Sequence, residues 1–364
     1  MSLAFDLVPN TRRTSPKRLE EILANPGFVK YFSDHMAIAT WTEQDGWHDS
    51  KIQNYQSFEM LPGSGILHYA QEIFEGMKAY RHQDGSIWLF RPKMNAQRLN
   101  FSASRLVMPQ LPEEDFMTSV FALMRADQDW VPQPDAAFYL RPFIFADQEF
   151  LGVKSASRFT YAVIGGPAGS YLGDGVTPVD IWVTTNFARV GNDGTGAVKC
   201  GGNYAASLSA LREGTAHDCS QVLFTDASTH QWVEELGGMN FFIVTRDNEL
   251  ITPPTTGTIL AGITRDSILT IAPSLGLTPI ARPISLEQML AGITDGEITE
   301  AFACGTAVVI TPIGALVQDI NGSLVKTELS SPPGEATMAL RRAIVDIQFG
   351  RADDRFSWMQ KVVP

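Results

Sequence analysis

The stretch Gly194-Thr195-Gly196-Ala197-Val198-Lys199-Cys200-Gly201-Gly202-Asn203-Tyr204 carries the strongest local signal in the chain. Its lysine, one of nine in 364 residues, lies between an apolar pair and a Gly-Gly turn, just before a predicted helix. A desolvated lysine has a lowered pKa, becomes nucleophilic and can form Schiff bases. The pattern fits equally well a lysine that extends from a strand end to solvent. The context of Lys199 alone leaves both interpretations open.

Four other segments carry groups that could bind an anion or a proton. In Leu260–Asp266 a glycine precedes a predicted helix, whose N–H groups and dipole could bind phosphate, although an ordinary helix start is the simpler interpretation. Cys304–Ala307 offers a hydroxyl and amides at a strand end, with the same ambiguity. Glu235 lies in a glycine-rich apolar run, either buried beside a cation or exposed on an edge strand. Arg141 lies inside an apolar strand and must meet an anion, for which a structural partner is the simpler candidate.

Together these segments supply a phosphate cradle, a Schiff-base lysine, an acid and a carboxylate clamp, which are the parts of a pyridoxal-phosphate site. Other chemistries lack their motifs. The sequence contains no GxxxxGK[ST] phosphate loop and no GxSxG elbow, and the run around Gly194 fails the GxGxxG spacing. Six scattered histidines show no zinc-ligand spacing, so we expect no metal site.

The composition narrows the class of protein. The net charge is −12, so we expect neither a nucleic-acid partner nor an anionic membrane surface, since both need a basic footprint. Hydrophobic residues make up 44% of the chain, enough for a large core. Three widely spaced cysteines and an N-terminus without a secretory pattern predict a cytoplasmic protein. The uncharged stretch 301–318 suits two buried strands joined by a turn better than a membrane span.

Hydrophobic spacing predicts strands and helices mixed along both halves, which favours an α/β or α+β fold over a sandwich or a bundle. The predicted helices cover residues 16–25, 67–77, 92–106, 113–130, 204–212, 264–275, 286–290 and 335–348. The predicted strands cover residues 35–41, 52–58, 78–81, 87–90, 137–145, 159–164, 180–185, 221–225, 240–245, 300–304 and 308–312. A glycine-rich run around residues 165–175 predicts a break between domains. We therefore expect a smaller N-terminal α/β domain over residues 1–166, an interdomain loop over 167–178 and a larger C-terminal domain over 179–364 that carries Lys199.

With these residues in view, the chain resembles the branched-chain amino acid aminotransferases of the fold-type IV pyridoxal-phosphate family. The matching motifs follow the family order along nearly the whole chain: Phe74-Glu75-Gly76-Met77-Lys78-Ala79-Tyr80, Leu89-Phe90-Arg91-Pro92, Tyr139-Leu140-Arg141-Pro142, Lys199-Cys200-Gly201-Gly202-Asn203-Tyr204, Glu235-Leu236-Gly237-Gly238-Met239-Asn240 and Gly305-Thr306-Ala307. The resemblance implies a two-domain mixed α/β fold of this type, with pyridoxal 5'-phosphate between the domains. The implied reaction moves the amino group of leucine, isoleucine or valine to 2-oxoglutarate in two half-reactions.

The resemblance also implies a role for each site residue. The residues that hold the cofactor would be the Schiff-base lysine and proton shuttle Lys199, the pyridine partner Glu235, the ring-oxygen partner Tyr204, and the phosphate ligands Arg91, Ile263, Thr264 and Thr306. The residues that bind the substrate carboxylate would be Tyr139, Arg141, Thr306 and Ala307. The residues that shape the side-chain pocket would be Phe32, Tyr69, Phe74, Tyr171 and Gly238.

Three further expectations come from the resemblance. In the family, Tyr69 and the turn at 151–153 reach the neighbouring subunit's site, which implies a homodimer. Animal members carry a Cys-x-x-Cys pair where this chain has Val308 and Thr311, so we expect no thiol switch there. The same members have threonine in place of Gly238, which leaves the shape of the pocket open.

Three alternatives remain at this stage. A D-amino acid aminotransferase or an aminodeoxychorismate lyase shares the fold, but these relatives are typically shorter and lack the long N-terminal segment. A non-catalytic pyridoxal-phosphate carrier would keep Lys199 but need neither Arg141 nor Glu235. A cofactor-free Schiff-base aldolase would not need a phosphate cradle. For the branched-chain aminotransferase itself we expect small-molecule ligands: leucine, isoleucine, valine, glutamate and their 2-oxo acids.

Overall fold

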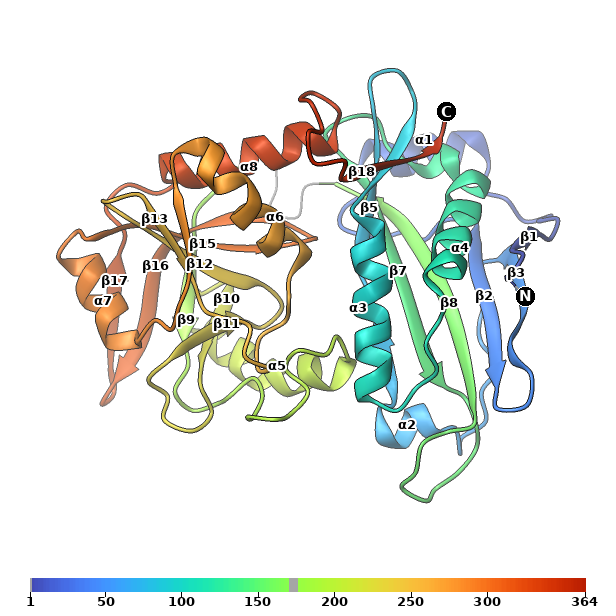
Figure 1. The fold of residues 1–364 in the computed structure, drawn as a ribbon, viewed down its shortest axis with the longest axis horizontal. Coiled ribbons are helices and arrows are strands. Elements are labelled where there is room, and N and C mark those ends of the chain that lie inside the picture. The colour runs from blue at the N-terminus through green and yellow to red at the C-terminus, as the bar shows by residue number, and fades with distance from the viewer. Residues whose placement is uncertain (1, 170–175) are drawn as a thin grey trace. The chain divides into compact units, whose positions relative to one another are not determined.

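The computed structural model describes residues 2–169 and 176–364 (Figure 1). The chain divides into two compact units. Unit 1 comprises Met1–Tyr171, Val198–Gly201 and Asp346–Pro364, and unit 2 comprises Leu172–Ala197 and Gly202–Val345. Each unit contains one large β-sheet with helices packed against it. The predicted mixed α/β class is therefore confirmed.

Unit 1 is built on a sheet in the order β1-β3-β2-β8-β7-β5-β6-β18, with β4 paired to β7. Its strands are β1 (Asp6–Leu7), β2 (His35–Thr42), β3 (Gly46–Asn54), β4 (Glu72–Phe74), β5 (Met77–Arg81), β6 (Ile87–Phe90), β7 (Ala137–Ala146), β8 (Arg158–Ala168) and β18 (Met359–Val363). Its helices are α1 (Pro16–Ala24), α2 (Gly65–Tyr69), α3 (Pro92–Arg105), α4 (Glu113–Ala126) and the short 3₁₀ turn η1 (Gln128–Trp130). The two longest, α3 and α4, pack on each other, and α4 lies against β2, β3 and β8.

The amphipathic pattern of α4 explains how it covers the sheet. Phe116, Val120, Leu123 and Met124 recur at helical spacing and are all buried. Strand β7, between β8 and β5 in this sheet, is buried along most of its length and pairs with β8 over ten residues. Because side chains alternate along a strand, residues 139 and 141 of β7 share one face. The candidate site of unit 1 therefore rests on a central, fully paired strand.

Unit 2 has a mixed sheet in the order β11-β10-β9-β16-β15-β12-β13-β14, with β17 paired to β16. Its strands are β9 (Val179–Val183), β10 (Gln221–Thr225), β11 (Val233–Leu236), β12 (Asn240–Thr245), β13 (Glu249–Thr252), β14 (Thr278–Ala281), β15 (Ile298–Gly305), β16 (Val309–Ile320) and β17 (Ser323–Glu328). Its helices, of which α5 and α8 extend slightly past its chain bounds, are α5 (Gly201–Ala216), α6 (Ile263–Ile271), η2 (Ala272–Leu275), α7 (Leu286–Thr294) and α8 (Glu335–Gln348). Helices α6 and α7 pack against β15 (Figure 1).

The stretch predicted as a helix over residues 67–77 is wrong in most of its length. Helix α2 ends at Tyr69 because Ala70 adopts a left-handed conformation with φ of 48°. Residues Glu72–Phe74 then form β4, which pairs with β7. The apolar spacing of this stretch predicted a helix, and pairing of residues 72–74 with a distant strand overrides that local signal.

Other differences lie at element ends and edges. The strand predicted over 52–58 is β3, which begins at Gly46, where a positive φ allows the hairpin turn, and ends at Asn54. The helix predicted over 113–130 ends at Ala126, before the 3₁₀ turn η1. Strands β1, β11, β13, β14, β17 and β18 were not predicted. All six are short, and their pairing depends on partners that local sequence does not reveal.

The stretch 301–318 forms parts of β15 and β16 with a turn at 306–308, which confirms the two-strand prediction. Among the residues that the structure describes, no helix is long and apolar enough to cross a membrane. The structure groups Val198–Gly201 and Asp346–Pro364 with unit 1, although chain order had placed both in the C-terminal domain. Val198 and Cys200 enter the core of unit 1, and β18 pairs with β6. The boundaries at residues 166 and 179 stay a prediction.

Candidate active site

Lys199 lies in unit 1 with its backbone fixed on both sides. Its N–H donates to Oγ of Ser102 at 3.1 Å, and its carbonyl accepts from the N–H of Phe74 at 2.9 Å. Its neighbours Val198 and Cys200 are buried, and its own side chain is half-buried. The amine Nζ lies 4.7 Å from the centroid of the Phe74 ring. This geometry fits a fixed, partly desolvated lysine better than one that extends to solvent.

Arg141 approaches the same aromatic ring from β7. Its guanidinium carbon lies 4.6 Å from the Phe74 centroid and 5.6 Å from the centroid of Tyr139. Its Nη2 donates to the Tyr139 hydroxyl at 3.2 Å. Its Nε is buried and has no hydrogen-bond partner in the described part of the chain. A buried charged donor without a partner is costly unless a ligand meets it, so this arginine fits an anion-binding role.

Two carboxylates flank Phe74 and are already engaged. Glu75 is fully buried, and both its oxygens accept from Arg98, at 2.8 Å each. Glu72 accepts from the N–H of Gly201, and burial raises the pKa of Glu72 although that N–H and the charge of Arg141 act in the opposite direction. Within residues 2–169 and 176–364, neither acid forms an ion pair with Arg141. The predicted structural partner is therefore not found there, and the arginine can meet an incoming carboxylate.

Glycine is required at two close approaches around Tyr139. A Cβ on Gly76 would lie 2.1 Å from the Tyr139 hydroxyl, and one on Gly166 would lie 2.0 Å from the carbonyl oxygen of Tyr31. The second contact brings the segment with Phe32 against β8, next to β7. Phe32 itself is 40% exposed and stacks on Tyr55 at 5.0 Å. Gly76, known from the sequence only as a motif residue, thus has a defined role beside the clamp.

One predicted pocket residue, Tyr69, does not join this cluster. Tyr69 stacks on Phe150 at 5.8 Å and donates its hydroxyl to the carbonyl of Leu151. Within one chain it therefore belongs with the turn at 151–153. Tyr171 lies outside the described residues.

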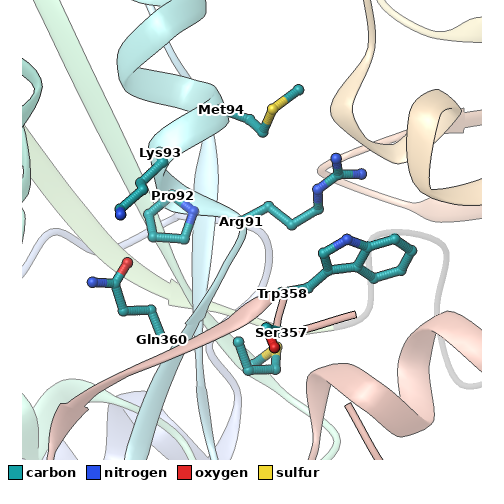
Figure 2. A pocket seen from close by; sticks show the side chains of 8 residues that line it. Arg91, Pro92, Lys93, Met94, Ser357, Trp358 and Gln360 are labelled. Atoms are coloured by element: carbon teal, nitrogen blue, oxygen red, sulfur yellow. The ribbon is translucent and has the colours of Figure 1, made fainter. Parts of the chain in front are cut away.

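Arg91 lies at the start of α3 beside the C-terminal segment. Its N–H donates to the carbonyl of Trp358 at 2.8 Å, and its guanidinium carbon lies 4.8 Å from the centroid of the Trp358 ring. Figure 2 shows the two side chains extending together, on the opposite side from Lys93 and Gln360. They line a cavity of about 350 Å³ between the first turn of α3 and residues 357–360.

In unit 2, Glu235 is a buried carboxylate surrounded by donors. Its Oε1 accepts from Nη2 of Arg189 at 2.8 Å and from the N–H of Leu260 at 3.1 Å. Its Oε2 accepts from Nδ2 of Asn240 at 2.9 Å. Only 3% of the residue is exposed. These donors favour the charged form of Glu235, as a partner of a protonated ring nitrogen requires.

Sequence reasoning missed Arg189 and the role of Asn240. Arg189 also donates to the carbonyls of Gly196 and Thr258, and Asn240 donates to the carbonyl of Leu260. A Cβ on Gly262 would lie 1.9 Å from Oδ1 of Asn240, so this amide needs the glycine at that position. The available signal was a single arginine in the glycine-rich run before Lys199, together with the asparagine that ends the Glu235 motif.

The predicted phosphate ligands of unit 2 lie at a helix start and a turn. Helix α6 begins at Ile263 after Gly262, and no described side chain caps it. The first N–H groups of a helix have no partner within the helix, so those of Ile263 and Thr264 can bind an anion. Thr306 and Ala307 lie in the turn between β15 and β16. That these groups bind a phosphate stays a prediction.

Tyr204 lies in the first turn of α5, close to Gly238. A Cβ on Gly238 would lie 3.3 Å from Cε1 of Tyr204, which is tighter than an ordinary contact. A threonine at position 238 would therefore press on the Tyr204 ring. The glycine at position 238 therefore leaves more space for the Tyr204 ring than a threonine there would.

Comparisons with known proteins identify the family of the chain. The family described as amino-transferase class IV matches residues 72–316. The branched-chain-amino-acid aminotransferase of Mycolicibacterium smegmatis is 44% identical over 365 residues, which cover 99% of this chain and 98% of that protein. The crystal structure of the Escherichia coli branched-chain amino acid aminotransferase superposes with a TM-score of 0.73 at 26% identity and covers 90% of this chain and 99% of that one. The branched-chain aminotransferase of the archaeon Thermoproteus uzoniensis, solved with norvaline, gives 0.73 at 25% identity, with the same coverage.

Proposed function

The chain belongs to the class IV aminotransferases, and from this premise we propose that it transfers the amino group of leucine, isoleucine or valine to 2-oxoglutarate. The observation that carries the proposal is the Phe74 cluster of unit 1. Lys199 and Arg141 meet one aromatic ring, at 4.7 and 4.6 Å from its centroid. Lys199 fits the role of the Schiff-base lysine, and Arg141 fits the role of a group that binds the substrate carboxylate. The names of relatives that match nearly the whole chain support the same activity.

The alternatives are not favoured. The match to a branched-chain enzyme extends over 99% of this chain, including the N-terminal segment that the shorter relatives lack. A cofactor carrier or a cofactor-free aldolase would not need a buried glutamate held by Arg189, Leu260 and Asn240. The chain therefore has the donors and charges of a complete transaminase.

The cofactor is pyridoxal 5'-phosphate, and the residues of the chain fit it. Bound there, it supplies an electron sink for the negative charge that develops at the substrate Cα. Lys199 offers the amine, Glu235 the anion for the ring nitrogen, and Tyr204 a hydroxyl. Arg91, the amides of Ile263 and Thr264, and Thr306 offer the phosphate donors. The uncapped start of α6 and the partnerless Nε of Arg141 are the features that a bound anion would satisfy.

The residues have three kinds of role in the reaction: they transfer a proton, stabilise charge and orient the substrate. Arg141 and Tyr139 bind the substrate carboxylate and orient Cα toward Lys199. With the cofactor bound, Nζ of Lys199 would take the proton from the substrate Cα and deliver it to the cofactor carbon C4′, as a general acid–base does. Glu235, which pairs with Arg189, would stabilise the proton on the ring nitrogen of the bound cofactor. The Phe74 ring lies against both side chains, at 4.6 Å from Arg141 and 4.7 Å from Lys199.

We also propose a homodimer in the cytoplasm. Leu151 and Val153 are 70% and 91% exposed beside Tyr69, and exposed apolar groups of this kind favour contact with a second copy. The three cysteines are buried thiols, which fits a reducing compartment. Gel filtration with light scattering would test the assembly.

The experiment that tests the proposed activity compares kcat/KM for L-leucine, L-alanine, L-aspartate, L-glutamate and D-alanine. Alanine loses burial of two or three methylene-sized groups at about 0.8 kcal/mol each, so we expect it to be roughly 15- to 60-fold poorer than leucine. Aspartate should also be poor, because its short side chain brings charge into an apolar wall. Glutamate should react, since its longer side chain reaches polar groups. Faster turnover of D-alanine than of L-leucine would show that the chain serves the rival family.

A further inference from the structure

Arg91 has a backbone conformation that needs external support. Its φ of 49° and ψ of 43° lie in the left-handed region, which residues other than glycine rarely adopt. It also directly precedes Pro92, and a following proline further restricts the backbone. Such strained residues persist only where the surrounding structure fixes them, and they concentrate at functional sites.

The support comes from the C-terminal segment, far away in the sequence. The carbonyl of Trp358 accepts the N–H of Arg91 at 2.8 Å. Asp354 holds this segment by accepting from the N–H groups of Trp358 at 3.0 Å and Met359 at 2.7 Å. Strand β18 follows at once, and its Met359 pairs with Phe90 of β6. Phe90, which precedes Arg91, and Met359, which follows Trp358, are therefore paired in one sheet.

The indole ring of Trp358 is held by two aromatic neighbours. It stacks on Phe356 at 4.4 Å with an interplanar angle of 20°, and meets the edge of Phe90 at 5.6 Å and 81°. The Arg91 guanidinium carbon lies 4.8 Å from the Trp358 centroid. Figure 2 shows the two side chains extending to the same side. Stacking occupies the flat face of a guanidinium and leaves its N–H groups directed around the edge, where an anion accepts them.

We propose that Trp358 is a positioning residue that holds the guanidinium of Arg91 in place for the phosphate of the cofactor. The inference rests on the proposed function, because it takes Arg91 as a phosphate ligand. Trp358 acts through Arg91, with its carbonyl on the backbone and its ring on the side chain. The C-terminal segment thereby becomes part of the cofactor site, although no motif in the sequence marks it.

The test measures the affinity of the full-length chain, stripped of cofactor, for pyridoxal 5'-phosphate and for pyridoxal. Pyridoxal lacks the phosphate, so a phosphate-specific effect leaves its affinity unchanged. Trp358→Leu should weaken pyridoxal 5'-phosphate binding by about 5- to 30-fold, the range of a partly desolvated cation–π contact. Trp358→Phe keeps an aromatic face and should recover most of that loss.

A double-mutant cycle with Arg91→Ala separates positioning from general damage. In the Arg91→Ala background, Trp358→Leu should cause no further loss of pyridoxal 5'-phosphate affinity, because the residue through which it acts is gone. The matched control is Trp88→Leu on the neighbouring strand β6. The ring of Trp88 also has a cation near it, Nζ of Lys361 at 5.6 Å from its centroid, and it stacks on His82 at 5.2 Å. That variant should bind both ligands as the wild type does.

Each contrary outcome identifies what is wrong. Equal weakening of pyridoxal and pyridoxal 5'-phosphate by Trp358→Leu, or losses that add in the double mutant, would show a structural role and overturn the inference. Unchanged affinity in Trp358→Leu while Arg91→Ala binds weakly would overturn it and leave the proposed function standing. Unchanged affinity in Arg91→Ala would remove the phosphate role of Arg91, and with it the inference. Failure of the wild-type chain to bind pyridoxal 5'-phosphate at all would contradict the proposed function itself.

Discussion

At the scale of single residues, the site depends on charges that are held before any ligand arrives. The two cations of unit 1 share the Phe74 ring, and the glutamate of unit 2 is enclosed by donors from Arg189, Leu260 and Asn240. Such fixed groups stabilise charge that develops in a reaction without having to reorganise. Substitution of one held charge should therefore affect catalysis more than stability.

Arg141→Leu should raise KM for the amino acid and lower kcat/KM by about 10- to 150-fold. This is the effect of losing a hydrogen bond to a charged group, worth about 1.5–3 kcal/mol. Steady-state kinetics with L-leucine measure it, and the matched control is Arg158→Leu on the adjacent strand β8, where the arginine is exposed. Equal losses in the two variants would show that Arg141 does not bind the substrate.

The thermal stability of the protein should depend on pH through Glu234. Only 6% of it is exposed, its Oε2 has no partner in the described part of the chain, and burial raises the pKa of Glu234 against the effects of Thr258 and Arg189. An acid with a raised pKa in the fold contributes stability below its unfolded pKa and loses that contribution as pH rises through the folded value. Glu234→Gln should therefore melt at a higher temperature than the wild type at pH 7, with the difference shrinking toward pH 4.

Thermal unfolding of both proteins across this pH range is the measurement. A difference in Tm that grows as the pH falls would have the wrong sign and would contradict the burial argument. The Gln side chain keeps an oxygen that can accept the bond from Thr258, so the comparison isolates the charge.

At the scale of elements, the turn between β4 and β5 places Gly76 against the hydroxyl of Tyr139. Gly76→Ala should displace Tyr139, because the new Cβ would lie 2.1 Å from its hydroxyl. We expect KM for L-leucine to rise by about tenfold or more, as a 1.4 kcal/mol change would produce, while cofactor affinity changes little. Gly191→Ala, at a glycine with open space around its Cβ position, is the control. Wild-type kinetics in Gly76→Ala would mean that the Tyr139 hydroxyl is not needed at its observed position.

The sequence predicted elements best where the signal is local. Helix α8 and strands β10 and β12 have the predicted bounds, and α3 differs by one residue. Helical spacing of apolar residues indicates the two helices, Pro92 indicates the start of α3, and continuous apolar runs indicate the two strands. The helix over 67–77 failed because pairing of β4 with β7 overrides local spacing. The candidate site followed the same rule. Local context marked Lys199 and Arg141 as candidates without deciding their roles, whereas the contacts of Arg189 and Trp358 are with residues far away in the chain.

At the scale of the whole molecule, the residues of the proposed site belong to both units. Lys199, Arg141 and Arg91 are part of unit 1, whereas Glu235 and Tyr204 are part of unit 2. Chain order alone could not assign Lys199, because a four-residue segment packs into the core of one unit while the chain on either side belongs to the other. That the cofactor lies between the two domains stays a prediction, and neither unit alone should bind it as the whole chain does.

The most direct test of the account is the half-reaction of the purified protein with single amino acids, followed by its visible absorption. We predict a yellow protein that loses its colour with L-leucine and regains it with 2-oxoglutarate, whereas Lys199→Ala does neither at a comparable rate. Loss of a general acid–base group alone slows a reaction by about 10²- to 10⁴-fold. A colour change with D-alanine that is faster than with L-leucine, or an undiminished rate in Lys199→Ala, would contradict the central claim.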